Sequence, residues 1–316
     1  MKNHFRNRLL LAFLAACALS ASAAPFAYVP NEGSGTVSVI DTEKDEVVAE
    51  IAAGTKPRGL AAGATNRWLY VSDQPNNRLT LIDLRLRKAA GHVNLGESPE
   101  GVSISPDGRW VAAAVEERNE LVITSTKTHK RAFAIPVKGR NPEHAVFSPD
   151  GKFIFVSAEE GDAVDVIDFK ARKQVSQVAV GARPRGIGFL PDSSRAYVAT
   201  ENSDEVYVID GKTFAIIERI KAGKRSNGVA VHPDGSRVYI SNGGEASVSV
   251  IDTATNAIIA TVPVGQRPWN MAITPDGKKL YVANGRSNSV SVIDTVQNTK
   301  LRDVAVGKLP WGVVIK

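Results

Sequence analysis

The chain repeats one pattern seven times, and this repetition limits the possible folds more than any other feature. A glycine closes each unit, and successive glycines are 42 residues apart except for one interval of 43. These glycines are Gly54, Gly96, Gly139, Gly181, Gly223, Gly265 and Gly307. Three residues after each glycine comes a proline, or Ser226 in one unit, and an aspartate column, broken only by Ser125, keeps the same register. Three columns in one register indicate an internal structural repeat.

Each unit contains four short segments with the alternating pattern of β-strands. In the sixth unit these segments are 270–274, 279–283, 290–294 and 301–306, and the turn sequence Pro275-Asp276-Gly277 separates the first two. Such a turn is typical of adjacent antiparallel strands. A sheet of this kind cannot bury both faces by itself, but it can when it is stacked between similar sheets. The one extra residue, in the second interval, is expected in the turn at 127–131.

Four strands in each of seven units predict an all-β fold, a seven-bladed β-propeller with four-stranded antiparallel blades. The two ends of the repeat predict how the ring closes. Residues 26–29 match the second strand of a unit, and residues 311–315 match a lone first strand. The C-terminal strand should therefore join the N-terminal blade, three strands plus one, which leaves no open edge. One propeller domain is expected over residues 25–316.

Residues 1–24 have the three parts of a secretory signal peptide: a basic start, an apolar run over 9–19 and small residues before a cleavage point after Ala23 or Ala24. We therefore expect export to the periplasm. The apolar run is too short to span a bilayer, so no transmembrane segment is expected in the mature chain. Residues 14–17 also resemble a lipobox, and the alternative is a lipoprotein anchored through Cys17, the only cysteine.

The formal net charge of +6 falls to +3 once the three basic residues of the export segment, Lys2, Arg6 and Arg8, are removed. This mild charge gives no support for nucleic-acid binding. Together with the expected export, it predicts a protein without a nucleic-acid partner.

Three segments carry a resemblance to a known family. Residues 197–200, 239–242 and 281–284 read Tyr-Val-Ala-Thr, Tyr-Ile-Ser-Asn and Tyr-Val-Ala-Asn, and each is followed by Val-x-Val-Ile-Asp. They resemble the YVTN family of β-propeller repeats, and the resemblance covers residues 26–316. With seven repeats and an export segment, the chain is most similar to the members associated with pyrroloquinoline quinone (PQQ)-dependent alcohol catabolism. The resemblance implies a periplasmic propeller linked to a transport operon, with no established catalytic role. It implies no bound cofactor, although an association with PQQ stays open.

A site is expected where the repeats differ, in the loops that enter the first strand of each unit and rim the central channel. Basic residues gather there, namely Lys56, Arg58, Arg183, Arg185, Arg225 and Arg267. Acidic residues at the same end are expected opposite them, namely Glu100, Glu143, Glu116, Glu117, Glu159 and Glu160. A mouth polarised in this way would attract a small anionic ligand or a charged protein partner. The alternative is that these are solvated loop charges.

Two tryptophans and a histidine also stand at variable positions of this rim. Trp269 and Trp311 are either a stacking platform for a partner or plugs that fill space beside the last blades. His144 replaces a glycine found in five other units. It is either a general base or metal ligand beside Glu143 and Glu100, or a substitute for glycine at positive φ. No metal site is predicted, because the other histidines have no ligand spacing.

These observations favour a non-enzymatic periplasmic binding or scaffold protein, expected as a monomer, that serves a PQQ-dependent alcohol catabolism or transport system. Its partner would be a periplasmic redox or transport component, or a small anionic ligand. The alternative is a propeller hydrolase, such as a lactonase, that uses Glu143, His144 and Glu100. The sequence contains no nucleophile elbow and no glycine-rich phosphate loop, which weighs against an enzyme without excluding one.

Overall fold

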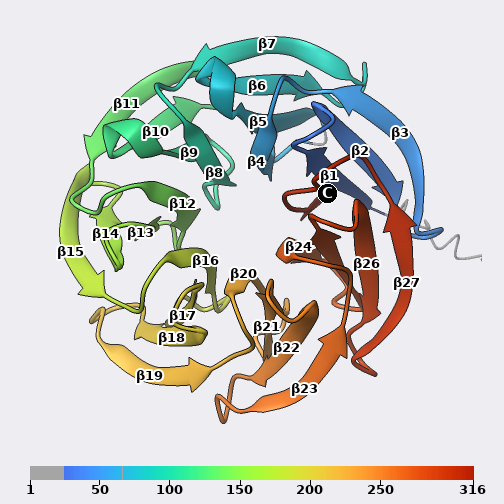
Figure 1. Ribbon diagram of the computed structural model, residues 1–316. Coiled ribbons are helices and arrows are strands. Elements are labelled where there is room, and N and C mark those ends of the chain that lie inside the picture. The colour runs from blue at the N-terminus through green and yellow to red at the C-terminus, as the bar shows by residue number, and fades with distance from the viewer. Residues whose placement is uncertain (1–24, 66) are drawn as a thin grey trace, which may run out of the picture.

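The computed structural model describes residues 25–65 and 67–316, and in this part of the chain seven four-stranded antiparallel sheets form a closed ring (Figure 1). The innermost strands are β28 (Val314–Ile315), β4 (Pro57–Ala62), β8 (Pro99–Ile104), β12 (Pro142–Phe147), β16 (Pro184–Phe189), β20 (Ser226–Val231) and β24 (Pro268–Ile273). The second strands are β1 (Phe26–Asn31), β5 (Trp68–Asp73), β9 (Trp110–Val115), β13 (Phe153–Ala158), β17 (Arg195–Thr200), β21 (Arg237–Asn242) and β25 (Lys279–Asn284).

The third strands are β2 (Thr36–Asp41), β6 (Arg78–Asp83), β10 (Glu120–Ser125), β14 (Ala163–Asp168), β18 (Glu205–Asp210), β22 (Ser247–Asp252) and β26 (Ser289–Asp294). The outermost strands are β3 (Glu46–Ala52), β7 (Lys88–Asn94), β11 (Lys130–Pro136), β15 (Lys173–Ala179), β19 (Ile216–Lys221), β23 (Ile258–Pro263) and β27 (Thr299–Ala305). Two short 3₁₀ helices, η1 (Gln74–Asn76) and η2 (Glu116–Arg118), follow second strands. The all-β, seven-bladed prediction is confirmed.

The core lies between adjacent blades, as expected for sheets that bury their faces by stacking. The middle strands are buried on both faces, whereas the outermost strand β27 buries one residue of seven. One apolar cluster joins Val29 of β1 to Tyr281 of β25, which belongs to the neighbouring blade. The Tyr281 hydroxyl donates hydrogen bonds to the Asp45 carboxylate and, over 3.3 Å, to the carbonyl oxygen of Thr42. Each blade therefore depends on its neighbours for burial.

The C-terminal strand closes the ring as predicted. β28 pairs antiparallel with β1, with Ala27 opposite Ile315 and Tyr28 opposite Val314. The backbone N–H of Phe26 donates to the carbonyl oxygen of Lys316 over 2.8 Å, and the reverse bond measures 2.9 Å. The first blade thus consists of three N-terminal strands and one C-terminal strand.

The extra residue of the 43-residue interval is not in the turn at 127–131, and that expectation was wrong. This turn has the same length as its counterparts: the left-handed residue His129 comes four positions after Ser125, as Asp45 does after Asp41. The insertion lies instead in the loop 137–141, which runs from β11 to β12. The turn is fixed by its left-handed residue, whereas a loop that crosses between blades can absorb one more residue.

The expected export segment, residues 1–24 with Cys17, lies outside the described residues, so its function stays a prediction. Among the residues that the structure describes, none belongs to a helix with the length and apolar character needed to cross a membrane.

Candidate functional site at the channel mouth

Three positions of the repeat lie at one end of the channel: the residues on either side of the repeated proline and the residue directly after the second strand. They lie there because each first strand begins at this end and its antiparallel partner, the second strand, ends at it. In the third blade, for example, Pro99 at the start of β8 pairs with Val115 at the end of β9. The side chains that gather at this end enclose a cavity of about 310 Å³. Its lining consists of Glu32, Arg58, Gln74, Glu116, Glu143, Glu159, Arg183, Arg185, Trp269 and Trp311. The cavity therefore holds most of the predicted rim.

The backbone at the entrance to each innermost strand is held by a repeated contact. The residue before the repeated proline, or before Ser226 in one unit, has a left-handed conformation in six blades. Its φ lies between 52° and 61° in Ser98, Asn141, Arg183, Arg225, Arg267 and Leu309. The backbone N–H of Arg183 donates to Asp162 Oδ1 over 3.0 Å, and that of Arg225 donates to Asp204 Oδ1 over 2.7 Å. These bonds fix the loops from which the rim side chains project.

Arginines dominate one half of the mouth, where they surround Glu201. The guanidinium nitrogens of Arg267, Arg225, Arg183 and Arg185 lie 2.5, 2.8, 3.4 and 3.7 Å from its carboxylate oxygens. Glu201 is fully buried. Burial by itself would raise the pKa of this carboxyl, but the positive charges of Arg185 and Arg267 hold it below its ordinary value. Glu201 is therefore ionised. We call these five residues the arginine half.

Glutamates dominate the opposite half, which we define as Glu100, Glu116, Glu143 and Glu159. Burial, together with the nearby charge of Glu143, raises the pKa of Glu116 to about 7 and raises that of Glu100 well above its ordinary value. Burial and Glu143 also raise the pKa of Glu159, against the opposing effect of Arg185. This glutamate half contains more carboxylates than the neighbouring cations can neutralise.

Arg185 connects the two halves. Its guanidinium contacts Glu143 over 3.3 Å, forms a short ion pair with Glu159 and reaches Glu201. Burial opposes the charge on Arg185, but the three carboxylates outweigh it and raise the pKa of this guanidinium above its ordinary value. Arg183 connects the halves in the same way, because it forms a short ion pair with Glu159 and lies 3.4 Å from Glu201.

Lys56 and Arg58 lie apart from the other basic residues. Lys56 Nζ lies 3.2 Å from Glu32 Oε1, and Arg58 Nε lies 3.2 Å from Glu32 Oε2. Arg58 also forms a short ion pair with the buried Glu100. These two cations are thus placed beside the glutamate half and do not extend the arginine half. Of the other acidic residues named from the sequence, Glu117 and Glu160 are exposed and do not line the cavity.

Trp311 and His144 close the channel below the cavity. Their rings stack with centroids 5.3 Å apart and planes 17° from parallel. Both also line a second, smaller cavity of about 120 Å³ on the channel axis, together with Asn270. Trp311 is only 7% exposed, which favours the plug interpretation for this residue. Trp269 lines the larger cavity and packs over Gly285, where a side chain would have no room.

His144 is placed differently from either interpretation of the sequence. The glycines at its repeat position do not have positive φ, so the conformational explanation was wrong. Glycine is required there by close approach: a Cβ on Gly59 would lie 2.3 Å from the carbonyl oxygen of Glu100 in the next blade. Burial, with Arg185 nearby, lowers the pKa of His144 to about 3. Its imidazole is therefore neutral at physiological pH.

Two acidic residues of the site, Glu32 and Glu201, were not predicted. Both belong to a repeat position directly after the second strand, occupied by Glu32, Gln74, Glu116, Glu159, Glu201, Gly243 and Gly285. This column was readable in the sequence at the same 42-residue spacing. This column also explains how Trp269 is accommodated. In the blade of Trp269 the column residue is Gly285, which leaves space for the indole ring.

Comparisons with known proteins agree with this architecture. The family model described as "YNCE-like beta-propeller" matches residues 9–316. A search of curated proteins found no match to the chain.

Among solved structures, hydrazine synthase from Kuenenia stuttgartiensis is similar, with 21% identity over 90% of this chain and 99% of that one and a TM-score of 0.79. A protein of unknown function from Desulfotomaculum acetoxidans has 18% identity over 92% and 98%, with a TM-score of 0.80. A candidate 6-phosphogluconolactonase from Bacteroides uniformis has 22% identity over 93% and 100%, with a TM-score of 0.78. At these identities the likeness establishes the fold alone.

Proposed function

Since the chain belongs to the YNCE-like β-propeller family, we propose that it is a non-enzymatic binding protein whose ligand or partner docks at the channel mouth. The observation that carries this proposal is the cavity of about 310 Å³ with its two oppositely charged halves. A concave site with convergent polar groups is the usual form of a ligand site. We propose a small anionic ligand or the charged surface of a protein as the occupant.

The arginine half supplies the positive charge that such an occupant needs. The side chains of Arg183, which lines the cavity, and of Arg225, which does not, are 38% and 49% exposed, so both can contact an occupant of the mouth while they remain paired with Glu201. Guanidinium groups bind carboxylates and phosphates in a bidentate manner. Trp269, which lines the same cavity, adds an aromatic surface for packing.

The pathway is part of the proposal. Together with the expected export segment, the resemblance to PQQ-associated propellers supports a periplasmic protein that serves a PQQ-dependent alcohol catabolism or transport system. A periplasmic redox or transport component is then the proposed protein partner, and PQQ itself is one anionic compound to be tested.

Thermal unfolding in the presence of PQQ, other quinones, small carboxylates and a cytochrome c tests the proposal. A ligand at 100 times its Kd adds about 2.7 kcal/mol to stability, which raises the Tm by several degrees in a protein of this size. The double variant R183Q/R225Q should lose the shift, whereas R109Q, an exposed arginine in the turn between β8 and β9 at the other end of the channel, should keep it. If no compound shifts the Tm and affinity capture from periplasmic extract retains no partner, the proposal fails.

A hydrolase remains a second candidate because Glu116, which lines the cavity, has a pKa of about 7, within the useful range of a general acid or base. His144 does not support this candidate, since a pKa of about 3 makes its ring a weak base and the ring is stacked on Trp311. Replacement of Glu116 and Glu143 by alanine should abolish turnover of a lactone if the candidate is right. Equal rates for this double variant and the wild-type protein would reject it.

A further inference from the structure

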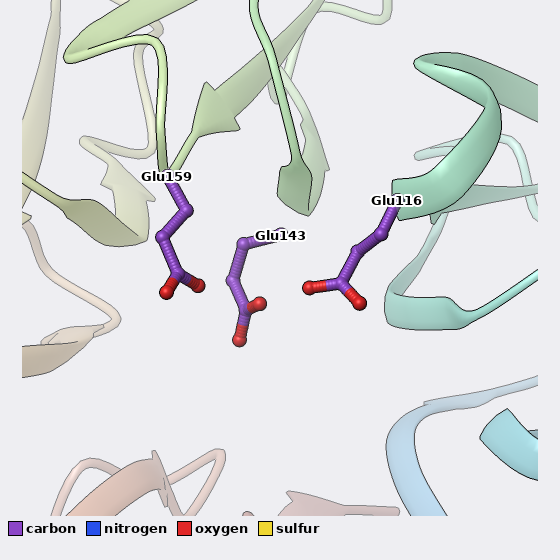
Figure 2. A group of neighbouring side chains, drawn as sticks. All are labelled: Glu116, Glu143 and Glu159. Atoms are coloured by element: carbon purple, nitrogen blue, oxygen red, sulfur yellow. The ribbon is translucent and has the colours of Figure 1, made fainter.

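Three carboxylates of the glutamate half converge on one point of the cavity wall. Glu116 comes from η2, Glu143 from the start of β12 and Glu159 from the loop after β13, and Figure 2 shows their carboxylates turned toward one another. One oxygen atom of each lies within 4.8 Å of the corresponding oxygens of the other two. Three elements of two adjacent blades thus bring three potential anions to one place.

The carboxylate of Glu143 is only partly satisfied by its surroundings. Its side chain is only 2% exposed, and its buried Oε1 accepts no hydrogen bond among the described residues. The nearest positive group is Arg185 Nη2 at 3.3 Å, whose guanidinium also serves Glu159 and Glu201. A buried carboxylate oxygen that points into a cavity without a donor is a costly arrangement unless a further group completes it.

Glu116 is without a cation. Its carboxylate accepts a hydrogen bond from the Ser98 hydroxyl over 2.6 Å, and no lysine or arginine among the described residues lies within 4.0 Å of it. The cavity it lines is large enough to admit an ion with its water ligands.

We propose that Glu116, Glu143 and Glu159 bind a divalent cation at the channel mouth, and that this cation is Ca²⁺. Carboxylate-only ligands select hard cations over the metals that prefer imidazole or thiolate. Ca²⁺ accepts six to eight oxygen ligands in flexible geometry, whereas Mg²⁺ demands a near-ideal octahedron. Three carboxylates that come from separate segments of two blades fit the more permissive ion.

The site goes beyond the proposed function, since it uses the glutamate half and needs no anionic ligand or protein partner. A bound Ca²⁺ would neutralise the excess negative charge of this half. It would also offer open coordination positions, filled by water, to a ligand in the cavity.

Luminescence of Tb³⁺, a probe ion that replaces Ca²⁺, tests the site directly because Trp269 and Trp311 line the same cavity and can sensitise its emission. The purified protein is treated with EDTA, titrated with Tb³⁺ and then with Ca²⁺. We expect one Tb³⁺ per chain, displaced by Ca²⁺ and much less readily by Mg²⁺. In E143Q and E116Q the Kd should rise at least about tenfold, the lower range for loss of a supporting group at a metal site.

E117Q is the matched control, because Glu117 is the exposed neighbour of Glu116 on the same 3₁₀ turn and should leave the Kd unchanged. Circular dichroism identifies a variant that fails to fold, and E116Q, at a less buried position, replaces E143Q in that event. Absence of Tb³⁺ emission, or an unchanged Kd in both folded variants, would overturn the site. R225Q, whose arginine pairs with Glu201 and with none of the three proposed ligands, should retain Tb³⁺ binding, so failure of the proposed function is distinguishable from failure of this site.

Discussion

Around Glu201, four arginines approach a single carboxylate, whereas the four carboxylates of the glutamate half share Arg58, Arg183 and Arg185, and two of these arginines also pair with Glu201. The two halves lie on one rim and derive from the same repeat positions, yet the pKa of Glu201 is lowered and those of Glu100, Glu116 and Glu159 are raised. All of these side chains are wholly or largely buried, so burial cannot explain the opposite directions. The directions of these pKa shifts are determined by the ratio of arginine to glutamate side chains in the neighbouring blades.

The two halves should also contribute to stability in different ways. An ion pair in the arginine half is satisfied, and its loss leaves uncompensated charge in the interior. The glutamate half is unsatisfied, and loss of one of its carboxylates removes repulsion. Substitutions in the two halves should therefore change stability in opposite directions.

The largest effect is expected for E201Q. This substitution leaves four arginines clustered without their carboxylate, and removal of one partner from a buried ion pair costs about 3–5 kcal/mol. Urea unfolding at pH 7 should show this loss, and E160Q, in an exposed loop, should show almost none. An equal, small effect for both variants would contradict the distinction between the halves.

The next largest effect is the loss of unfolding free energy at low pH that is caused by His144. His144 lies beneath the mouth with a pKa of about 3 when folded, against about 6.5 when unfolded, so its contribution to stability is present above pH 6.5 and is lost as the pH falls toward 3. At pH 4.5 this loss amounts to about 2–3 kcal/mol. H144N, which copies Asn270 at the same position in the seventh blade, should be less acid-sensitive by this amount in urea unfolding at pH 4.5 and pH 7. Parallel profiles for the two proteins would contradict it.

A smaller effect of opposite sign is expected for E116Q. The raised pKa of Glu116 means that its protonated form is preferred in the folded state, so stability is lost as the pH rises through about 7. Glutamine mimics the protonated form. In EDTA at pH 8 the variant should be more stable by about 1 kcal/mol after allowance for solvent screening, with no gain at pH 4.5. A loss of stability at pH 8 would show that Glu116 is not repelled by its neighbours.

The smallest effect is expected for R225Q. Its side chain is 49% exposed and Glu201 keeps three other arginines. The change in unfolding free energy should stay below about 1 kcal/mol, as for other solvent-exposed ion pairs. A loss as large as that of E201Q would mean that the four arginines do not share the carboxylate.

The fold was predictable because its signal is repeated seven times: register, blade number and ring closure all follow from columns spaced by 42 residues. Most of the cavity lining was also predictable, since the residues flanking the prolines enter the innermost strands at the mouth. Glu32 and Glu201 were not predicted, because their repeat position, directly after the second strand, is occupied by glutamate in only four units and by glutamine or glycine in the other three.

Other features depend on distances that no repeat encodes. Arg58 pairs with Glu32 and Glu100 because long side chains cross between adjacent blades. The glycine column at His144 reflects close approach of neighbouring strands, which the sequence cannot distinguish from a need for positive φ. The inserted residue could not be placed for a similar reason. In the sequence, a shift of β11 by one residue would move the insertion from the loop after this strand to the turn before it.

The opposite charge states of the two halves can be measured residue by residue. Carbon-13 NMR of the glutamate side-chain carboxyls, in EDTA and with E116Q and E201Q for assignment, gives the titration midpoint of each group. We predict a midpoint of about 7 for Glu116 and one below the ordinary glutamate value for Glu201. Midpoints for both groups at the ordinary value near 4.3 would contradict this prediction.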